Sequence, residues 1–264
     1  MLENIVDHRF YANFFKYRFL LMELVKKDIK IKYRRSVLGI FWSFMEPLLF
    51  MIVLTIIFST LFQNSIPNYP VYLLTGRLVF MFFATATRGS MRSIYGNAST
   101  IKKLYVPKYI FTLGMTLSNL VTFLLSLIIL IAVMIVTQAP FTLFIFTSII
   151  PMALLLIFTI GVGLILATIT VFFRDVEHLY GVFTTLLLYG SAIFFPPEII
   201  PAQFQFLLYF NPVFVYISMF RDSFLYATFF DPFQLIYGTV CAISALFIGM
   251  YIFYKNQDRF ILYI

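Results

Sequence analysis

Long apolar segments alternate with short polar ones along this chain, and the sharpest change follows a basic run. Lysine and arginine crowd residues 26–35, whereas Glu46 is the one ionisable residue between positions 36 and 62. A helix over residues 38–61 would be about 36 Å long at about 1.5 Å per residue, enough to cross a bilayer core. Because basic residues favour the cytosolic side of such a helix, the amino terminus is expected in the cytosol.

The apolar segments predict six membrane-spanning helices that alternate in direction. A seventh crossing over residues 204–226 would place Lys255 and Arg259 outside, against the preference of basic residues for the cytosol. Six spans are therefore favoured, with both termini in the cytosol. The expected spans are 38–61, 71–93, 110–136, 143–172, 180–195 and 231–254. They form one transmembrane domain over residues 1–264, with a cytosolic or interfacial segment at 1–36, a six-span core at 37–255 and a cytosolic tail at 256–264.

Two regions are apolar but unsuited to a full crossing. Residues 10–25 combine a wide apolar face with three charged side chains, which favours an amphipathic helix in the inner headgroup layer. Such a helix would serve as a passive anchor or as part of a gate. Residues 198–210 and 212–230 are both short for a span and are separated by an Asn-Pro helix-start signal. They predict a pair of re-entrant helices that dip into the outer leaflet and return.

Composition supports the same fold class. The chain is 62% hydrophobic and 11% charged, against about 25% charged residues in a soluble domain, so an all-α integral membrane protein is expected. The net charge of +8 does not indicate nucleic-acid binding, because the basic residues gather at span ends. A single cysteine, Cys241, excludes an internal disulfide.

The sequence contains few residues that could form a catalytic or metal-binding site. Two scattered histidines, His8 and His178, and one cysteine cannot build a zinc site of the usual kind, so no metal is expected. The GxxxxGK[ST] loop that cradles nucleotide phosphates is absent. Glu46 alone gives thin support to a proton-coupled transporter, which uses relays of intramembrane carboxylates. We therefore expect neither enzymatic activity nor a cofactor on this chain.

Two cytosolic loops carry candidate functional residues. The first predicts a short amphipathic helix whose apolar stripe is flanked by lysines, and which either rests on the membrane or docks into the groove of a partner. Either Asn97 or Ser99 can cap this helix, and Pro107 limits it. The candidates in the first loop are Asn97, Ser99, Ile101, Lys102, Lys103, Leu104, Tyr105 and Pro107, and those in the second are Arg174, Asp175 and Glu177.

Four stretches together resemble the membrane subunits of ATP-driven, ABC-type polysaccharide exporters. They are DIKIKYRRSVLGIFWSFMEPLL at 28–49, NASTIKKLYVPK at 97–108, VFFRDVEHL at 171–179, and the FFP…IIP…LLYFNPVF…FRD run at 194–222. They cover nearly the whole chain in the order of that family. Its members export lipid-linked O-antigen, teichoic acid, capsule or related glycans.

The resemblance implies a homodimer in the cytoplasmic (inner) membrane, paired with two copies of a cytosolic ATPase subunit that would hold ATP and Mg. By position, residues 97–108 match the coupling helix of the family, which seats in a groove of the ATPase. The family conduit lies at the dimer centre and is lined by the first, second and fifth spans. Apolar sugar faces stack on aromatic rings, so aromatic residues of these spans line the conduit or serve as core and lipid-facing residues.

Glu46 and Arg77 depart from the neutral or apolar residues usual in that family. They could pair with each other across the first two spans, Glu46 could instead meet Arg88, or each could face the conduit. The conduit candidates are Glu46, Arg77, Phe80, Phe82, Phe83, Tyr189, Phe194 and Phe195.

Two other function classes stay open at this point. The first is an ABC-type exporter of a different cargo, such as a drug or lipid. The second is a membrane scaffold without transport activity.

Overall fold

The computed structural model describes residues 3–34, 36–62, 66–103 and 106–264, and every regular element within them is helical. Five helical segments are long and apolar enough to cross a membrane, which confirms the all-α membrane class. They are built on α2 (Trp42–Phe62), α3 (Tyr69–Arg92), α5 (Tyr109–Val136), α6 (Ile149–Phe172) and α10 (Pro232–Asn256). Short 3-10 turns extend three of them: Gly39–Phe41 before α2, Leu143–Ser148 before α6 and Gln257–Leu262 after α10.

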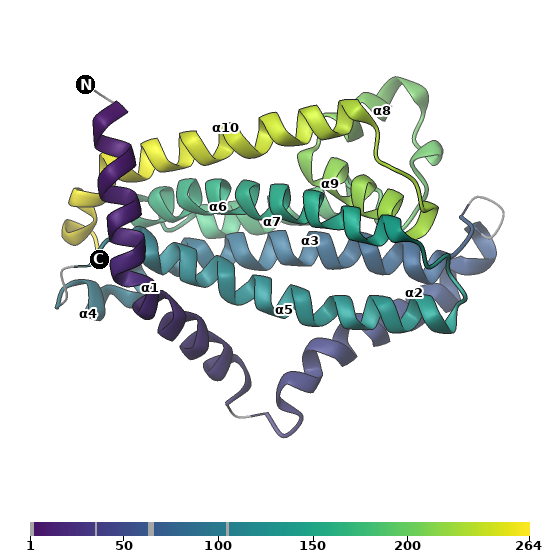
Figure 1. The fold of residues 1–264 in the computed structure, drawn as a ribbon, viewed down its shortest axis with the longest axis horizontal. Coiled ribbons are helices and arrows are strands. Elements are labelled where there is room, and N and C mark those ends of the chain that lie inside the picture. Colours follow the sequence, from purple (N-terminus) through teal and green to yellow (C-terminus); the bar gives the residue numbers. More distant parts are fainter. Residues whose placement is uncertain (1–2, 35, 63–65, 104–105) are drawn as a thin grey trace.

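Helix α3 lies at the centre of the bundle. It packs against α2, α5, α6 and α9, and most of its residues are buried. Figure 1 shows α3, α5, α6 and α10 running along the long axis of the molecule, with α2 at the edge. The large core around α3 therefore decides which surfaces remain open for function.

Small residues let the helices approach closely, as expected for helices in lipid. A Cβ atom added to Gly161 of α6 would lie 2.3 Å from the carbonyl carbon of Ala245 in α10, and one added to Gly249 would lie 2.3 Å from the oxygen of Gly161. On another face of α6, a Cβ atom at Gly163 would lie 2.8 Å from the hydroxyl of Ser90 in α3. Glycine at these positions allows α6 to pack closely against both α3 and α10.

The amino-terminal helix α1 (Glu3–Tyr33) is longer than the amphipathic segment predicted at 10–25. Its Leu21 and Leu24 side chains pack on α5 where Gly114 leaves room for them. Together with α4 and the carboxy-terminal turn, α1 lies at one end of the bundle, which we call the terminal end (Figure 1). A position of α1 at the membrane surface stays a prediction.

Helix α7 (Val176–Tyr189) differs from the span predicted at 180–195. It begins four residues earlier and ends six residues earlier, because the chain turns at Gly190 and Ala192 adopts a φ of +45°. Fourteen residues make a helix of about 21 Å, which is shorter than a hydrocarbon core of about 30 Å. The predicted count of six spans is not confirmed and stays a prediction.

The predicted pair of short helices is present but divided differently. The first is α8 (Ala202–Tyr209), preceded by a 3-10 turn at Pro197–Ile199. The second, α9 (Pro212–Arg221), continues as a π-helical turn at Asp222–Tyr226 and stops at Ala227, whose φ is +53°. The Asn-Pro signal acts as predicted, since the Asn211 side chain accepts a hydrogen bond from the Val213 N–H at 3.0 Å. Helix α9 is almost wholly buried against α3, α6 and α10.

Candidate functional site

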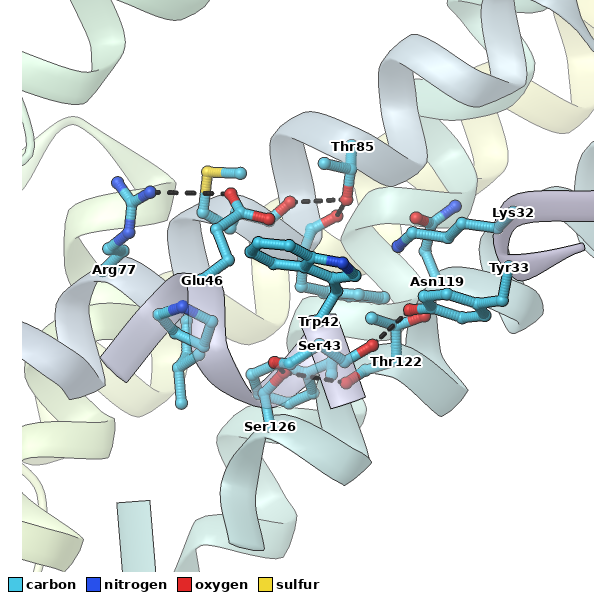
Figure 2. Close-up of a pocket in the computed structure, with 15 residues that line it drawn as sticks. Lys32, Tyr33, Trp42, Ser43, Glu46, Arg77, Thr85, Asn119, Thr122 and Ser126 are labelled. Atoms are coloured by element: carbon cyan, nitrogen blue, oxygen red, sulfur yellow. Dashed lines mark hydrogen bonds and ion pairs between the residues drawn. The ribbon is translucent and has the colours of Figure 1, made fainter. Parts of the chain in front are cut away.

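Glu46 and Arg77 point toward each other from α2 and α3 (Figure 2). The Arg77 Nη2 atom lies 3.9 Å from Glu46 Oε1, and the guanidinium sits over the Phe50 ring at 3.3 Å from its centroid. The Arg77 side chain is 11% exposed and that of Glu46 is 65% exposed. The pairing of these two residues is therefore the alternative that the structure supports, whereas Arg88 donates to the Thr184 hydroxyl at 3.3 Å.

A cavity of about 140 Å³ opens beside this ion pair, between α1, α2, α3 and α5. The Tyr33 and Ser43 hydroxyls are hydrogen-bonded across it, and Ser126 donates to the Ser43 carbonyl at 3.4 Å. Such a cavity can hold a few polar atoms against an otherwise apolar wall. Its polar lining is Lys32, Tyr33, Ser43, Glu46, Arg77, Thr85, Asn119, Thr122 and Ser126 (Figure 2).

Aromatic rings continue from Arg77 toward α7. The Phe50 ring lies 6.4 Å from the Phe194 ring, which lies 6.0 Å from the Tyr189 ring, and Tyr189 is 60% exposed. We call Glu46, Arg77, Phe50, Phe194 and Tyr189 the Arg77 strip. Four of these residues were conduit candidates from the sequence. Phe50 was missed, although its position one helical turn after Glu46 was a usable signal.

The other aromatic candidates do not join this strip. Phe80 and Phe83 are buried in the core around α3, where Phe83 stacks on Phe158 at 5.6 Å, so this structure does not expose them to a conduit and their lining role stays a prediction. Phe82 reaches the wall of the small cavity but is 3% exposed. Phe195 packs partly buried on a small cluster near α8. Their burial follows from the central place of α3, which leaves little of its surface free.

The predicted coupling segment, residues 97–108, begins at the last residue of a 3-10 turn (Tyr95–Asn97) and continues as the short helix α4 (Ala98–Ile101). Ile101 is 6% exposed and packs into the core at the terminal end, so its side chain is not available to a partner. Asn97 does not act as the expected cap: its amide donates to the Ser93 carbonyl at 2.8 Å and its oxygen accepts from Lys27 at 3.3 Å. The outer side of the segment carries Ser99, Lys102 and Lys103, which are exposed, with Pro107 half-buried after it; Leu104 and Tyr105 lie outside the described residues.

Glu177 joins this segment to the second predicted loop. Its carboxylate accepts from Arg92 at 3.0 Å (Nε) and 2.9 Å (Nη2), and from the Tyr95 hydroxyl. The Arg174 guanidinium lies over the Tyr95 ring at 5.6 Å, whereas Asp175 is exposed. The first and second loops are therefore held together by side chains at the terminal end. We call Arg92, Tyr95, Arg174 and Glu177 the Glu177 link.

Ionisation of Glu177 is favoured within the link. Burial raises the pKa of Glu177, but the hydrogen bonds from Tyr95 and Arg92 outweigh it and leave the pKa below its usual value. Burial, followed by the hydrogen bond to Glu177, raises the pKa of Tyr95 to about 12. Tyr95 therefore remains a donor and Glu177 an acceptor at neutral pH.

A family assignment follows from comparison with known sequences. The family model for the ABC-2 type transporter matches residues 20–225. The chain belongs to the ABC-2 type transporter family. The ABC-2 match includes both the Arg77 strip and the Glu177 link. It confirms the resemblance drawn from the sequence motifs.

Curated relatives of this ABC-2 chain are permeases of surface-polysaccharide systems. The O-antigen export system permease protein RfbA of Klebsiella pneumoniae is 31% identical, over 91% of this chain and 93% of the relative. The protein of the same name from Myxococcus xanthus is 31% identical, over 71% and 72%. The polysialic acid transport protein KpsM of Escherichia coli is 23% identical, over 89% and 92%. Similarity thus extends along the length of the bundle.

Proposed function

We propose that this ABC-2 chain is the membrane subunit of an ATP-driven exporter that moves a lipid-linked polysaccharide across the cytoplasmic membrane. The observation that carries the proposal is the 31% identity to an O-antigen export permease over more than nine tenths of both chains. The glycan is an O-antigen, a capsule or a related surface polymer. In the exporter, two copies of this chain form a homodimer with the conduit between them.

Energy for export comes from a partner, because the chain has no GxxxxGK[ST] loop. Two cytosolic ATPase subunits bind ATP and Mg and contact the terminal end, and both termini of this chain lie in the cytosol. The exposed lysines Lys102 and Lys103 give the coupling segment a positive outer side. An acidic groove on the ATPase would complement it.

Movement of the partner would reach the conduit through the Glu177 link. Tyr95 begins the 3-10 turn that leads into the coupling segment, Arg92 ends α3 and Glu177 lies in the first turn of α7, so a tilt of the segment acts on both helices at once. The opposite parts of the same helices carry Arg77 and Tyr189 of the Arg77 strip. A rigid-body shift of α3 and α7 would thereby widen or narrow the surface along which sugar rings stack on Phe50, Phe194 and Tyr189.

Deletion of the gene followed by analysis of surface glycans tests the proposed export function. The expected result is loss of one surface polymer and accumulation of its lipid-linked precursor inside the cell, both restored by the wild-type gene. An unchanged set of surface glycans would refute the proposal.

Contact with the ATPase is tested separately by copurification. The double change Lys102→Glu and Lys103→Glu is expected to reduce the amount of ATPase that copurifies at least threefold, because it reverses the charge of the segment. Lys255→Glu is the control, since Lys255 is exposed in the last turn of α10 and lies outside the coupling segment. Equal amounts of copurified ATPase with the wild type and both variants would contradict the coupling role of this segment.

A further inference from the structure

A second cavity, of about 280 Å³, lies at the end of the bundle opposite the terminal end, beside α3, α9 and α10. Its wall includes Arg221, the last residue of α9, which is 3% exposed. In Figure 1 this is the region of α8 and α9, far from the chain termini. The cavity is separate from the small one beside Glu46 and is wide enough for a phosphate group.

Arg221 is held in place by neutral partners. Its Nη2 atom donates to the carbonyl oxygens of Ala192 at 3.0 Å and Ile193 at 3.4 Å, and its guanidinium sits over the Tyr72 ring at 3.5 Å from the centroid. A Cβ atom at Gly76 would lie 2.8 Å from the same Nη2, so the glycine makes room for the guanidinium. The neighbouring backbone is thus shaped around this one cation.

Arg221 forms no ion pair among the described residues, although Asp222 follows it in the chain. Among the described residues no carboxylate oxygen lies within 4.0 Å of Arg221, and its Nε atom is buried without a hydrogen-bond partner there. A buried cation without a counter-charge is energetically costly. Arg77 provides the contrast, because it also lies over an aromatic ring but has Glu46 beside it. An anionic ligand in the cavity would give Arg221 the ion-pair partner that the described residues do not provide.

The other groups on the wall indicate which anion fits. Gln234 donates to the Ser218 hydroxyl at 3.3 Å, while its buried Oε1 atom has no partner among the described residues. Tyr226 also lines the cavity. Glu198 lines the cavity as well, but its side chain is exposed and forms no ion pair with Arg221. The unpartnered Nε–H of the Arg221 guanidinium, together with the amide and hydroxyl groups, suits a phosphate group that offers several acceptor oxygens and a hydroxyl.

The surroundings favour a phosphate that is attached to a lipid. Tyr209 lines the cavity and is exposed, and the exposed rings of Phe206 and Phe210 flank it on the same helical segment. An apolar rim of this kind accommodates an acyl or isoprenoid chain. A free, fully hydrated phosphate would gain nothing from that rim.

We propose that this cavity binds the phosphate of a membrane lipid, with Arg221 as its counter-charge and Gln234 as a neutral hydrogen-bond partner. As a carrier site the inference rests on the proposed function, because the lipid would then be the carrier end of the exported glycan. The same chemistry also fits an ordinary phospholipid headgroup. The two sources are separated by the choice of probe.

The test measures lipid binding to the purified exporter complex in nanodiscs by native mass spectrometry. The probes are a long-chain polyprenyl phosphate, the uncharged polyprenol and phosphatidylglycerol. The wild type is expected to bind polyprenyl phosphate at least tenfold more tightly than polyprenol. Arg221→Gln should remove this preference, and Gly76→Ala should reduce it at least threefold by displacing the guanidinium.

Two further variants keep the test decisive. Arg88→Gln removes a different intramembrane arginine, one that binds Thr184 outside the cavity, and should leave the preference unchanged. If Arg221→Gln does not fold, Gln234→Leu alters the opposite wall without disturbing the carbonyl contacts of Arg221, and should weaken phosphate binding at least twofold. Unchanged preference in Gly76→Ala and Gln234→Leu would overturn the proposal.

The outcomes also separate this site from the proposed function. Equal binding of phosphatidylglycerol and polyprenyl phosphate would confirm the phosphate site and contradict its role as a carrier site. Loss of phosphate binding in Arg221→Gln with normal export would likewise confirm the site and place it off the export path. Loss of export on gene deletion, with no phosphate preference in the wild type, would contradict this inference and leave the proposed function intact.

Discussion

Helices α2 and α3 are joined by a short connection and share an ion pair, but their surroundings are opposite. The most apolar window of the segment built on α2 has a mean hydropathy of 2.1 and is 17% buried, whereas that of α3 has 1.3 and is 72% buried. In water the more apolar helix would lie inside. In lipid, hydrocarbon solvates leucine as well as protein does, so the helix with polar residues is the one that other helices surround.

This difference explains the two charged residues. Arg77 belongs to the shielded helix and is covered by Phe50, while Glu46 belongs to the open helix and is mostly exposed. The ion pair therefore lies at the border between the packed core and the surface that we assign to the conduit. Substitutions in the two helices should differ accordingly.

The largest expected difference is between matched leucines. Leu74 of α3 is fully buried and Leu61 of α2 is 69% exposed. Leu74→Ala should lower the free energy of unfolding by about 2–5 kcal/mol because it leaves a cavity, while Leu61→Ala should change it by less than about 0.5 kcal/mol. Unfolding in mixed detergent micelles measures both. Equal costs would show that the exposed face of α2 is a protein interface.

The close approach of α6 to α3 should be the next most sensitive feature. Gly163→Ala places a methyl group 2.8 Å from the Ser90 hydroxyl and should cost about 1–3 kcal/mol by overpacking. Gly181→Ala in α7 is the control, since the nearest atom to its new Cβ is 3.9 Å away. Addition of Ser90→Ala should recover part of the loss in Gly163→Ala. If it recovers nothing in the same unfolding assay, the two helices do not meet at this point.

A smaller effect is expected from the ion pair itself. Glu46→Gln and Arg77→Gln, combined in a double-mutant cycle, should give a coupling energy of about 0.2–1 kcal/mol, because Glu46 is largely exposed. Export should fall in both single variants if the pair faces the conduit. Zero coupling together with unchanged export in both would refute the pairing and the conduit role at once.

The smallest effect should be a pH dependence of the free energy of unfolding, caused by Glu177 at the terminal end of the bundle. The pKa of Glu177 is lowered in the folded protein, so its contribution to stability is present above its ordinary pKa of 4.5 and is lost as pH falls through the lower folded value. The loss should stay below about 1 kcal/mol, since Arg92 is largely exposed. Unfolding between pH 7 and 3.5 should therefore show a step that Glu177→Gln lacks. The same step in that variant would assign it to another group.

Much of this architecture could be predicted from the sequence. The second span, expected at 71–93, is observed at Tyr69–Arg92, and the Asn-Pro start of α9 is where it was expected. Hydropathy and proline are local signals, and they were sufficient to predict the second span and the start of α9. The pairing of Glu46 with Arg77 was one of several alternatives, because the sequence does not define which faces of two helices meet.

The failures have a common physical cause. Apolar residues in a membrane helix look alike whether they face lipid or protein, so Phe80 and Phe83 could not be assigned to the core from their pattern. The end of α7 depends on distant residues, since Arg221 and the Tyr72 hydroxyl both donate to the Ala192 carbonyl. Ile101 was expected on an apolar stripe available to a partner, and only the packed structure shows that its side chain faces the chain itself.

Reconstituted transport tests most directly whether this chain is the membrane subunit of an ATP-driven exporter. The chain and its ATPase are placed in vesicles that contain the lipid-linked glycan, and a membrane-impermeant lectin detects glycan on the opposite leaflet. Glycan should appear there only when both subunits and hydrolysable ATP are present. Transport at the same rate by this chain alone, without nucleotide, would contradict the proposed mechanism.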